Sequence, residues 1–191
     1  MERILRGATI RLPGAIENVI KEELFLVLDE FLQKSSIWQE EVTFGVTSAA
    51  TEYELVPTGG TIVQLIHVQN SNEFRVAATM QTPPTIVLRD TPGTDTFTAN
   101  VALTVVDPTT REYEPEVPEW ILTKHHLTIL DGVLARMMSQ PAKSYTSDKH
   151  SIYHMRRFRN GIAVAAAEVK RGNLYGGQSW AFPQSFATGR K

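Results

Sequence analysis

Residues 117–172 read VPEWILTKHHLTILDGVLARMMSQPAKSYTSDKHSIYHMRRFRNGIAVAAAEVKRG, and this stretch decides the fold. Apolar residues recur in it at three- and four-residue steps on both sides of the connector 140–145, a period that predicts two amphipathic helices. Pro118 suits the first turn of the first helix, and a proline in the connector ends that helix. Ser147 is placed to cap the second helix, which ends at a glycine. The stretch therefore predicts a helical hairpin.

Each predicted helix has one apolar stripe and several small residues. The stripes are Trp120, Leu127, Leu130, Leu134 and Met137 in the first helix and Ile152, Met155, Phe158, Ile162, Ala165, Ala166 and Val169 in the second. Gly132 lies in the first helix, and Gly161 lies in the second. Side chains this short let helix axes approach closely. We therefore expect the hairpin to pack on other structure over most of its length.

A third helix is expected from Pro13 to about Gln33. Its apolar residues cover more than one stripe, since Phe25 and Leu26 add to the main one. That pattern indicates burial on two sides, either in the middle of a bundle or against a neighbouring subunit. The acidic residues of this helix are most simply a solvated face, because carboxylates are mostly exposed.

Between about residues 41 and 106 the apolar period changes to two residues, which is typical of strands. Six short runs bounded by glycine, proline and asparagine turns are the predicted strands, at 42–46, 53–56, 63–68, 74–78, 85–88 and 97–106. Short antiparallel strands joined by tight turns predict a small sandwich or open barrel. This unit is inserted between the third helix and the hairpin.

The expected fold class is therefore α+β, with a three-helix core, an inserted antiparallel β domain and an extended C-terminal arm. The three-helix core consists of the N-terminal helix and the C-terminal hairpin. The expected units are a helical core domain from residues 1–37 and 107–173, a β domain from residues 38–106, and an arm from residues 174–191.

The arm lacks a helical or strand period, yet it is rich in aromatic residues. Disordered segments are usually poor in aromatics, so we expect the arm to dock on a surface. The residues expected to make this contact are Tyr175, Trp180, Phe182 and Phe186.

Composition narrows the possible functions. A net charge of −2 removes the usual electrostatic argument for general nucleic-acid binding. The absence of cysteine excludes disulfides and thiolate chemistry. No apolar run approaches the roughly 20 residues of a membrane span, and the N-terminus lacks a signal-peptide core. We therefore expect a soluble protein without membrane contact.

No catalytic or nucleotide-binding motif is present in the chain, so we expect neither an enzyme nor a cofactor. His150 and His154 lie one helical turn apart and could in principle share a metal. Zinc sites normally use three or four protein ligands, however, and no further ligand is identified beside these two. We expect no metal site.

The basic cluster Arg156, Arg157 and Arg159 surrounds one aromatic residue, Phe158. Guanidinium groups here could grip phosphates, pair with carboxylates of a neighbouring subunit, or make loose pairs on an exposed face of their own chain. We favour protein contacts, because a nucleic-acid footprint is usually a broad basic surface. The expected interface residues are therefore the three arginines and the four aromatic residues of the arm.

Three runs of the chain carry a resemblance to a known family. They are GVLARMMSQPAKSY at 132–145, HMRRFRNGIA at 154–163 and SWAFPQSF at 179–186, and the shorter runs LPGAI at 12–16 and VPEWI at 117–121 fit the same pattern. Together they resemble virion neck proteins of tailed bacteriophages, most strongly over residues 117–186 and weakly across the β region. The layout is similar to the tail tubular, or gatekeeper, proteins of short-tailed phages.

The resemblance implies a head-to-tail adaptor. Such a protein forms a ring, usually a dodecamer, beneath the portal protein and joins it to a tail or nozzle protein. DNA passes through the lumen of the ring during ejection. The expected location is the neck of the virion, after assembly in the host cytoplasm. The family has no catalytic residues to carry over.

Two other interpretations stay open. The chain could be another structural virion component, such as a tail-completion or baseplate protein. It could also be a carbohydrate-binding module built on the β insertion, with an aromatic platform of Trp38, Phe44 and Tyr53. Two of these rings are more simply explained as part of the sheet core.

Overall fold

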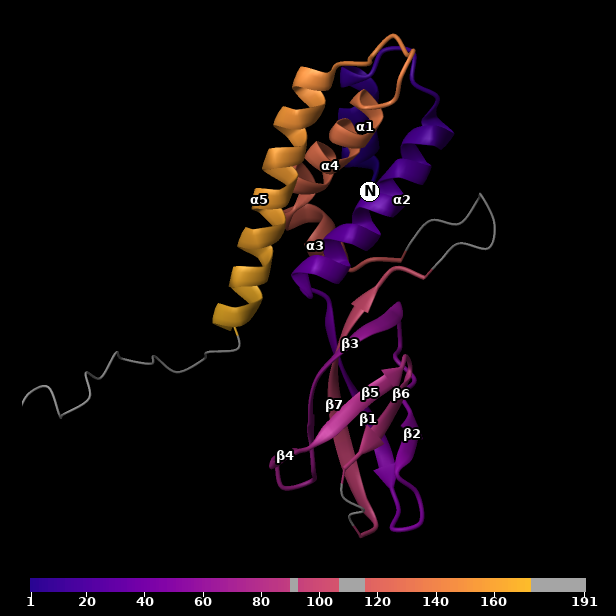
Figure 1. The fold of residues 1–191 in the computed structure, drawn as a ribbon, viewed down its shortest axis with the longest axis vertical. Helices are drawn as coiled ribbons and strands as arrows, with labels where there is room; N and C mark the ends of the chain where they lie inside the picture. The colour runs from indigo at the N-terminus through magenta and orange to yellow at the C-terminus, as the bar shows by residue number, and fades with distance from the viewer. Residues whose placement is uncertain (90–92, 107–115, 173–191) are drawn as a thin grey trace, which may run out of the picture.

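The computed structural model describes residues 1–89, 93–106 and 116–172. Helices gather at one end of an elongated molecule and strands at the other (Figure 1). In chain order the elements are α1 (Glu2–Arg11), α2 (Glu17–Ser35), β1 (Gln39–Val46), β2 (Glu52–Glu54), β3 (Thr61–Gln69), β4 (Arg75–Val76), β5 (Ala78–Thr82), β6 (Thr85–Leu88), β7 (Asp95–Thr104), α3 (Glu119–Lys124), α4 (His126–Met138) and α5 (Asp148–Gly172). The α+β class is confirmed.

The strands form two antiparallel sheets. One has the order β1-β7-β3-β4 and the other the order β2-β6-β5. Phe44 on β1 contacts Phe97 on β7 and Tyr53 on β2, with ring centroids 6.1 Å and 5.5 Å apart, and so links the two sheets. Alternate residues of β7 are buried over most of its length, as the two-residue period predicts.

One predicted strand is wrong. The run 74–78 is not one strand, because β4 pairs with β3 in the first sheet whereas β5 pairs with β6 in the second. The chain changes sheets at Ala77. Pro83 and Pro84 form a turn, and Thr82 and Thr85 pair across it. Residues 78–82 therefore form a hairpin with β6, the strand that follows the turn.

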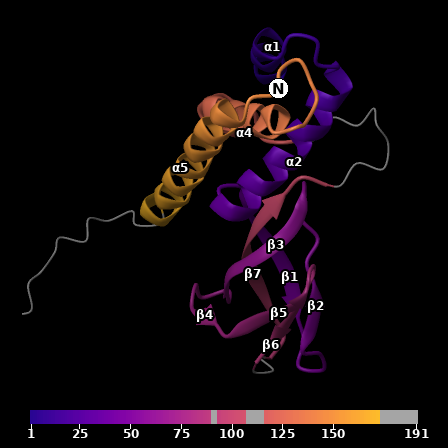
Figure 2. The ribbon, with the colours of Figure 1, turned by 45° about the horizontal axis from the view of Figure 1, so that its top comes forward.

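The helical hairpin is confirmed, and α2 packs against it. Figures 1 and 2 show α4 lying between α2 and α5. Ile129, Val133 and Met137 of α4 are fully buried. The core of the helices is continuous with that of the sheets, because buried residues of both form one hydrophobic cluster.

Two details of the helices differ from the prediction. Residues 2–11 form a helix, α1, that was not predicted; only Ile4 and Ala8 of it are buried, which is too short a stripe to stand out. The first helix of the hairpin is broken into α3 and α4 at His125, whose ring is buried at 5.3 Å from the ring of Phe31.

The predicted apolar stripes of the hairpin are wrong at three positions. Trp120, Leu127 and Ile152 are each more than half exposed. The break at His125 changes the helical phase before α4, so Trp120 no longer lies over the same face as Leu130. The other members of both stripes are buried or partly buried.

The junction between helices and strands is tightly packed. Ser36 ends α2 in a left-handed conformation, and Trp38 follows with only 8% of its surface exposed. Gly60 has a φ of +68° and lies under the Trp38 indole, where an added Cβ would be 2.5 Å from the Thr104 carbonyl oxygen. Thr104 at the end of β7 also donates a hydrogen bond to Asp29 of α2. These contacts join the two ends of the molecule.

Candidate functional site

The two helices of the hairpin approach closely at both glycines singled out from the sequence. A Cβ on Gly132 would lie 2.6 Å from Val27 of α2 and 3.0 Å from Phe158 of α5. A Cβ on Gly161 would collide with the side chain of Thr128 on α4. The expected close packing is therefore observed, and α5 is held firmly along its inner face.

The outer face of α5 is different in character. It presents Lys149, Arg156, Arg159 and Lys170, all exposed, with the apolar Ile152 among them. None of these four cations has a hydrogen bond or ion pair to any residue that the structure describes. An exposed row of unpaired cations is suited to contact with carboxylates or phosphates.

Arg157 is separated from the other two arginines by its contacts. Its Nε donates to Asp131 Oδ2 of α4 over 2.9 Å, and its Nη1 donates to the Tyr153 hydroxyl over 3.0 Å. Its guanidinium also lies over the Tyr153 ring, 5.6 Å from the centroid. The hydrogen bond to Tyr153, with the charge of Asp131, raises the pKa of Arg157. Arg157 is therefore engaged within its own subunit.

Asp131 is the residue of this region that sequence reasoning missed. Its side chain is only 8% exposed, and it receives Arg157 on one oxygen and His154 Nδ1, at 2.7 Å, on the other. A buried carboxylate needs such partners to offset the loss of water. The signal was available, since an acid stands between two members of the first helix's core, Leu130 and Gly132.

The histidine pair does not form a shared metal site. His154 is bonded to Asp131, whereas His150 Nδ1 lies 3.0 Å from the Ser147 hydroxyl. Ser147 had been expected to cap the helix with that hydroxyl. Within the described ranges, no three histidine, aspartate or glutamate side chains are grouped as metal ligands.

A second polar contact ties the far half of α5 to the break between α3 and α4. Lys124 Nζ lies 2.6 Å from Glu168 Oε2, and the buried His125 Nε2 lies 4.0 Å from the same oxygen. The hydrogen bond from Lys124 is the main reason that the pKa of Glu168 is lowered. Burial lowers the pKa of His125.

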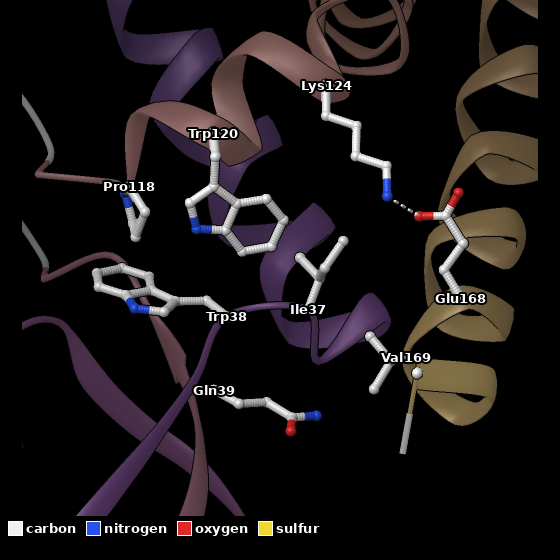
Figure 3. Close-up of a pocket in the computed structure, with 9 residues that line it drawn as sticks. Ile37, Trp38, Gln39, Pro118, Trp120, Lys124, Glu168 and Val169 are labelled. Atoms are coloured by element: carbon white, nitrogen blue, oxygen red, sulfur yellow. Dashed lines mark ion pairs between the residues drawn. The ribbon is translucent and has the colours of Figure 1, made fainter. Parts of the chain in front are cut away.

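A groove of about 360 Å³ opens beside this contact (Figure 3). It lies between the helix–strand junction and the C-terminal end of α5. The indoles of Trp38 and Trp120 form one side, and the Lys124–Glu168 pair lies at the other. Gly172, the last described residue, also lines the groove.

The whole C-terminal arm lies outside the described residues, and with it the remaining expected interface residues Tyr175, Trp180, Phe182 and Phe186. Most of the segment that leads from β7 to α3 also lies outside them. The three candidate sugar-binding rings are packed instead of forming one exposed surface. Trp38 is buried at the junction, and the Tyr53 hydroxyl donates to the Ala50 carbonyl.

No protein-family model matches the chain, and no curated protein matches it. Among the helices that the structure describes, none is long and apolar enough to cross a membrane.

Proposed function

We propose that this protein is a structural head-to-tail adaptor of a tailed bacteriophage. In this proposal, copies of the chain form a ring in the virion neck, beneath the portal protein. The ring joins the portal to a tail or nozzle protein, and DNA passes through its lumen. The resemblance of the runs at 132–145 and 154–163 to neck proteins supports the proposal, and so does the architecture of a helical core with a β insertion.

The observation that carries the proposal is the exposed apolar surface of the helical hairpin. Of eleven large hydrophobic side chains exposed in the described part of the chain, five lie on this hairpin: Trp120, Leu127, Ile152, Tyr153 and Val164. Leu127 adjoins Thr128 in the chain, and Thr128 packs against Gly161 of α5. Contiguous exposed apolar surface is typical of faces that bind other subunits, and the proposal assigns these five side chains to such faces.

The elongated shape adds a second argument. A ring subunit must contact two neighbours and also the layers above and below it. Exposed Ile10 belongs to α1 and exposed Ile16 directly precedes α2, in the helical part of the molecule. Exposed Phe74 lies between β3 and β4, in the strand part; Figure 1 shows these elements. Both parts therefore carry apolar side chains that a layered assembly would cover.

The test is a mass measurement of the purified full chain, alone and after mixing with a portal ring from the same phage. Light scattering is expected to report a closed oligomer, free or on the portal, and electron microscopy should show a ring with an open centre. A chain that remains a monomer at all concentrations and does not bind the portal ring would contradict the proposal. Binding to a baseplate or tail-tip complex instead would favour another structural virion component.

A further inference from the structure

The groove of about 360 Å³ beside the helix–strand junction has a largely apolar lining. Trp38 follows α2 and Trp120 belongs to α3, and Figure 3 shows their indoles on one side of the groove with Val169 of α5 across from them. Trp120 is 52% exposed although it stands in a concave site. A large exposed apolar side chain in a groove marks a place suited to binding.

The charges of the groove do not favour a charged ligand. Among the described residues that line it, Lys124 and Glu168 are the two ionisable ones, and they pair with each other over 2.6 Å. Gln39 adds an amide at the edge. The group that fits such a groove is mainly apolar with one or two polar atoms, and an aromatic side chain is a group of this kind.

The end of α5 determines which part of the chain can reach the groove. Gly172 is the last residue of α5 and also lines the groove. Residue 173 is bonded to it, so the C-terminal arm starts at the groove itself. Tyr175 follows Gly172 by three residues, which span at most about 11 Å when fully extended. An aromatic side chain is therefore tethered within reach of the two indoles.

Tethering favours Tyr175 over the other aromatic residues of the arm and over other molecules. Trp180, Phe182 and Phe186 follow Gly172 by eight or more residues, and a longer loop costs more entropy to close. A group on a short flexible tether has an effective concentration on the order of millimolar at its site. The arm of a second copy has no such advantage at ordinary protein concentrations.

We infer that Tyr175 packs into the groove of its own subunit, with its ring against the Trp120 indole. Tyrosine suits the site because its ring can contact the apolar side while its hydroxyl stays among the polar groups at the edge. The contact leaves the later aromatic residues of the arm free for a partner. Of the five exposed side chains of the hairpin, Trp120 is then the one whose groove side is covered by its own chain. The inference concerns a single subunit, so it does not depend on the adaptor proposal.

The test is acrylamide quenching of tryptophan fluorescence. The chain has three tryptophans, and Trp180→Phe removes the one in the arm. Trp38 is only 8% exposed, so Trp120 should account for most of the remaining quenching. In this background, Tyr175→Ala is expected to raise the quenching constant roughly twofold, because a half-exposed indole loses the ring that covers it. Removal of residues 174–191 should raise it to the same value.

Matched variants show whether the ring of Tyr175 is responsible. Tyr175→Phe keeps the ring and should keep the low quenching constant. Phe182→Ala removes a ring farther along the arm and should also leave it unchanged. Trp120→Phe leaves Trp38 as the reporter, and Tyr175→Ala should then have little effect. Circular dichroism melting should show that all variants are folded.

A mixing experiment distinguishes the chain's own arm from that of a neighbouring copy. The arm donor is the full chain with Trp120→Phe and Trp180→Phe, and the acceptor is the chain without residues 174–191, which retains Trp120. The two are refolded together with the donor in excess, and the donor's own signal is subtracted. Quenching of the acceptor should be unchanged. Protection of the acceptor would show that a neighbouring copy supplies the arm, and would overturn the inference.

The other outcomes are equally decisive. The inference is wrong if the full and the truncated chain are quenched alike, or if Tyr175→Ala is quenched like its parent. It is also wrong if Phe182→Ala has as large an effect as Tyr175→Ala, since another aromatic residue would then occupy the groove. None of these results bears on the adaptor proposal, which the mass measurement with the portal ring tests. A chain with a protected Trp120 that never assembles would contradict the adaptor proposal alone.

Discussion

Asp131 on α4 and His154 on α5 are joined through a contact of 2.7 Å between Oδ1 and Nδ1, at the place where the two helices of the hairpin pack. Arg157 occupies the second oxygen of the same carboxylate. Both partners of Asp131 therefore come from α5, one turn apart. The contact sets the alignment of α5 along α4, because sliding either helix by one turn would leave the carboxylate buried without partners.

Replacing Asp131 with Asn should destabilise the fold. The substitution removes the charge that faces His154 and Arg157 and leaves a buried polar group with poorer partners. We expect a loss of about 1–3 kcal/mol in the free energy of unfolding, measured by urea titration. Glu41→Gln, at an exposed position of β1, is the control and should change stability little. Equal midpoints for the two variants would contradict the structural role of Asp131.

Gly132→Leu and Gly161→Leu should each over-pack the hairpin. Even a Cβ would meet Val27 or Thr128 at these sites, so the helices must move apart. A loss of roughly 1–3 kcal/mol or more is expected in thermal melting followed by circular dichroism. Gly45→Ala is the control, since nothing lies within 4 Å of a Cβ added there. Unchanged midpoints for both leucine variants would show that the helices do not touch at these glycines.

The three arginines of the cluster should separate into two classes. Arg157→Gln is expected to lower stability with little direct effect on assembly, because Arg157 is bonded to Asp131 and Tyr153. Arg156→Gln with Arg159→Gln should leave the melting temperature unchanged and weaken assembly, and wild-type assembly should loosen as salt rises. Paired melting and light-scattering measurements check both effects. The contacts described for Arg157 would be wrong if Arg157→Gln weakened assembly alone and the double variant lowered the melting temperature.

Stability should fall as pH drops below about 6.5, in part because of His125. Burial against Phe31 lowers the pKa of His125, while Glu168 opposes and Lys124 reinforces that shift. At pH values between the folded and the unfolded pKa, His125 therefore binds a proton in the unfolded chain and not in the folded chain. The contribution of His125 is complete above its unfolded pKa and is lost as pH falls toward the folded one. His125→Gln should flatten the dependence of unfolding free energy on pH in this window.

Removal of residues 174–191 should leave the helices formed and prevent stable assembly. The segment contains four aromatic residues, and aromatic residues often carry a large share of the binding energy at interfaces. The far-ultraviolet circular dichroism of the truncated chain should match that of the described fold. Its mass after mixing with the portal ring should be that of a free monomer. Normal assembly of the truncated chain would show that the arm is not needed.

Sequence patterns predicted the parts of the fold that have long, regular periods. The hairpin and β7 are of this kind, because many residues repeat the same spacing. Short elements were missed for the same reason, since α1 buries only two residues and β5 is identified by its pairing with β6. Pairing between strands is a tertiary property that a local window does not contain.

The candidate site was predictable in composition but not in geometry. The sequence identifies Arg156, Arg157 and Arg159 as one cluster, yet helical spacing alone does not show which of them reaches Asp131. That choice depends on how α5 is rotated against α4, and the rotation follows from packing of residues such as Phe158 and Gly132. The position of a side chain around a helix therefore requires the partner helix to be placed first.

The packing of the Trp38 indole over Gly60 has a mechanical consequence. The chain passes from α2 to β1 through Ile37 and Trp38, which would act as a free pivot if the indole were in solvent. The indole is buried, and Thr104 is hydrogen-bonded to Asp29. Bending at this point would therefore have to expose the indole and break that hydrogen bond. A force applied to the strands is therefore transmitted to the helices, and the two parts of the molecule move as one rigid body.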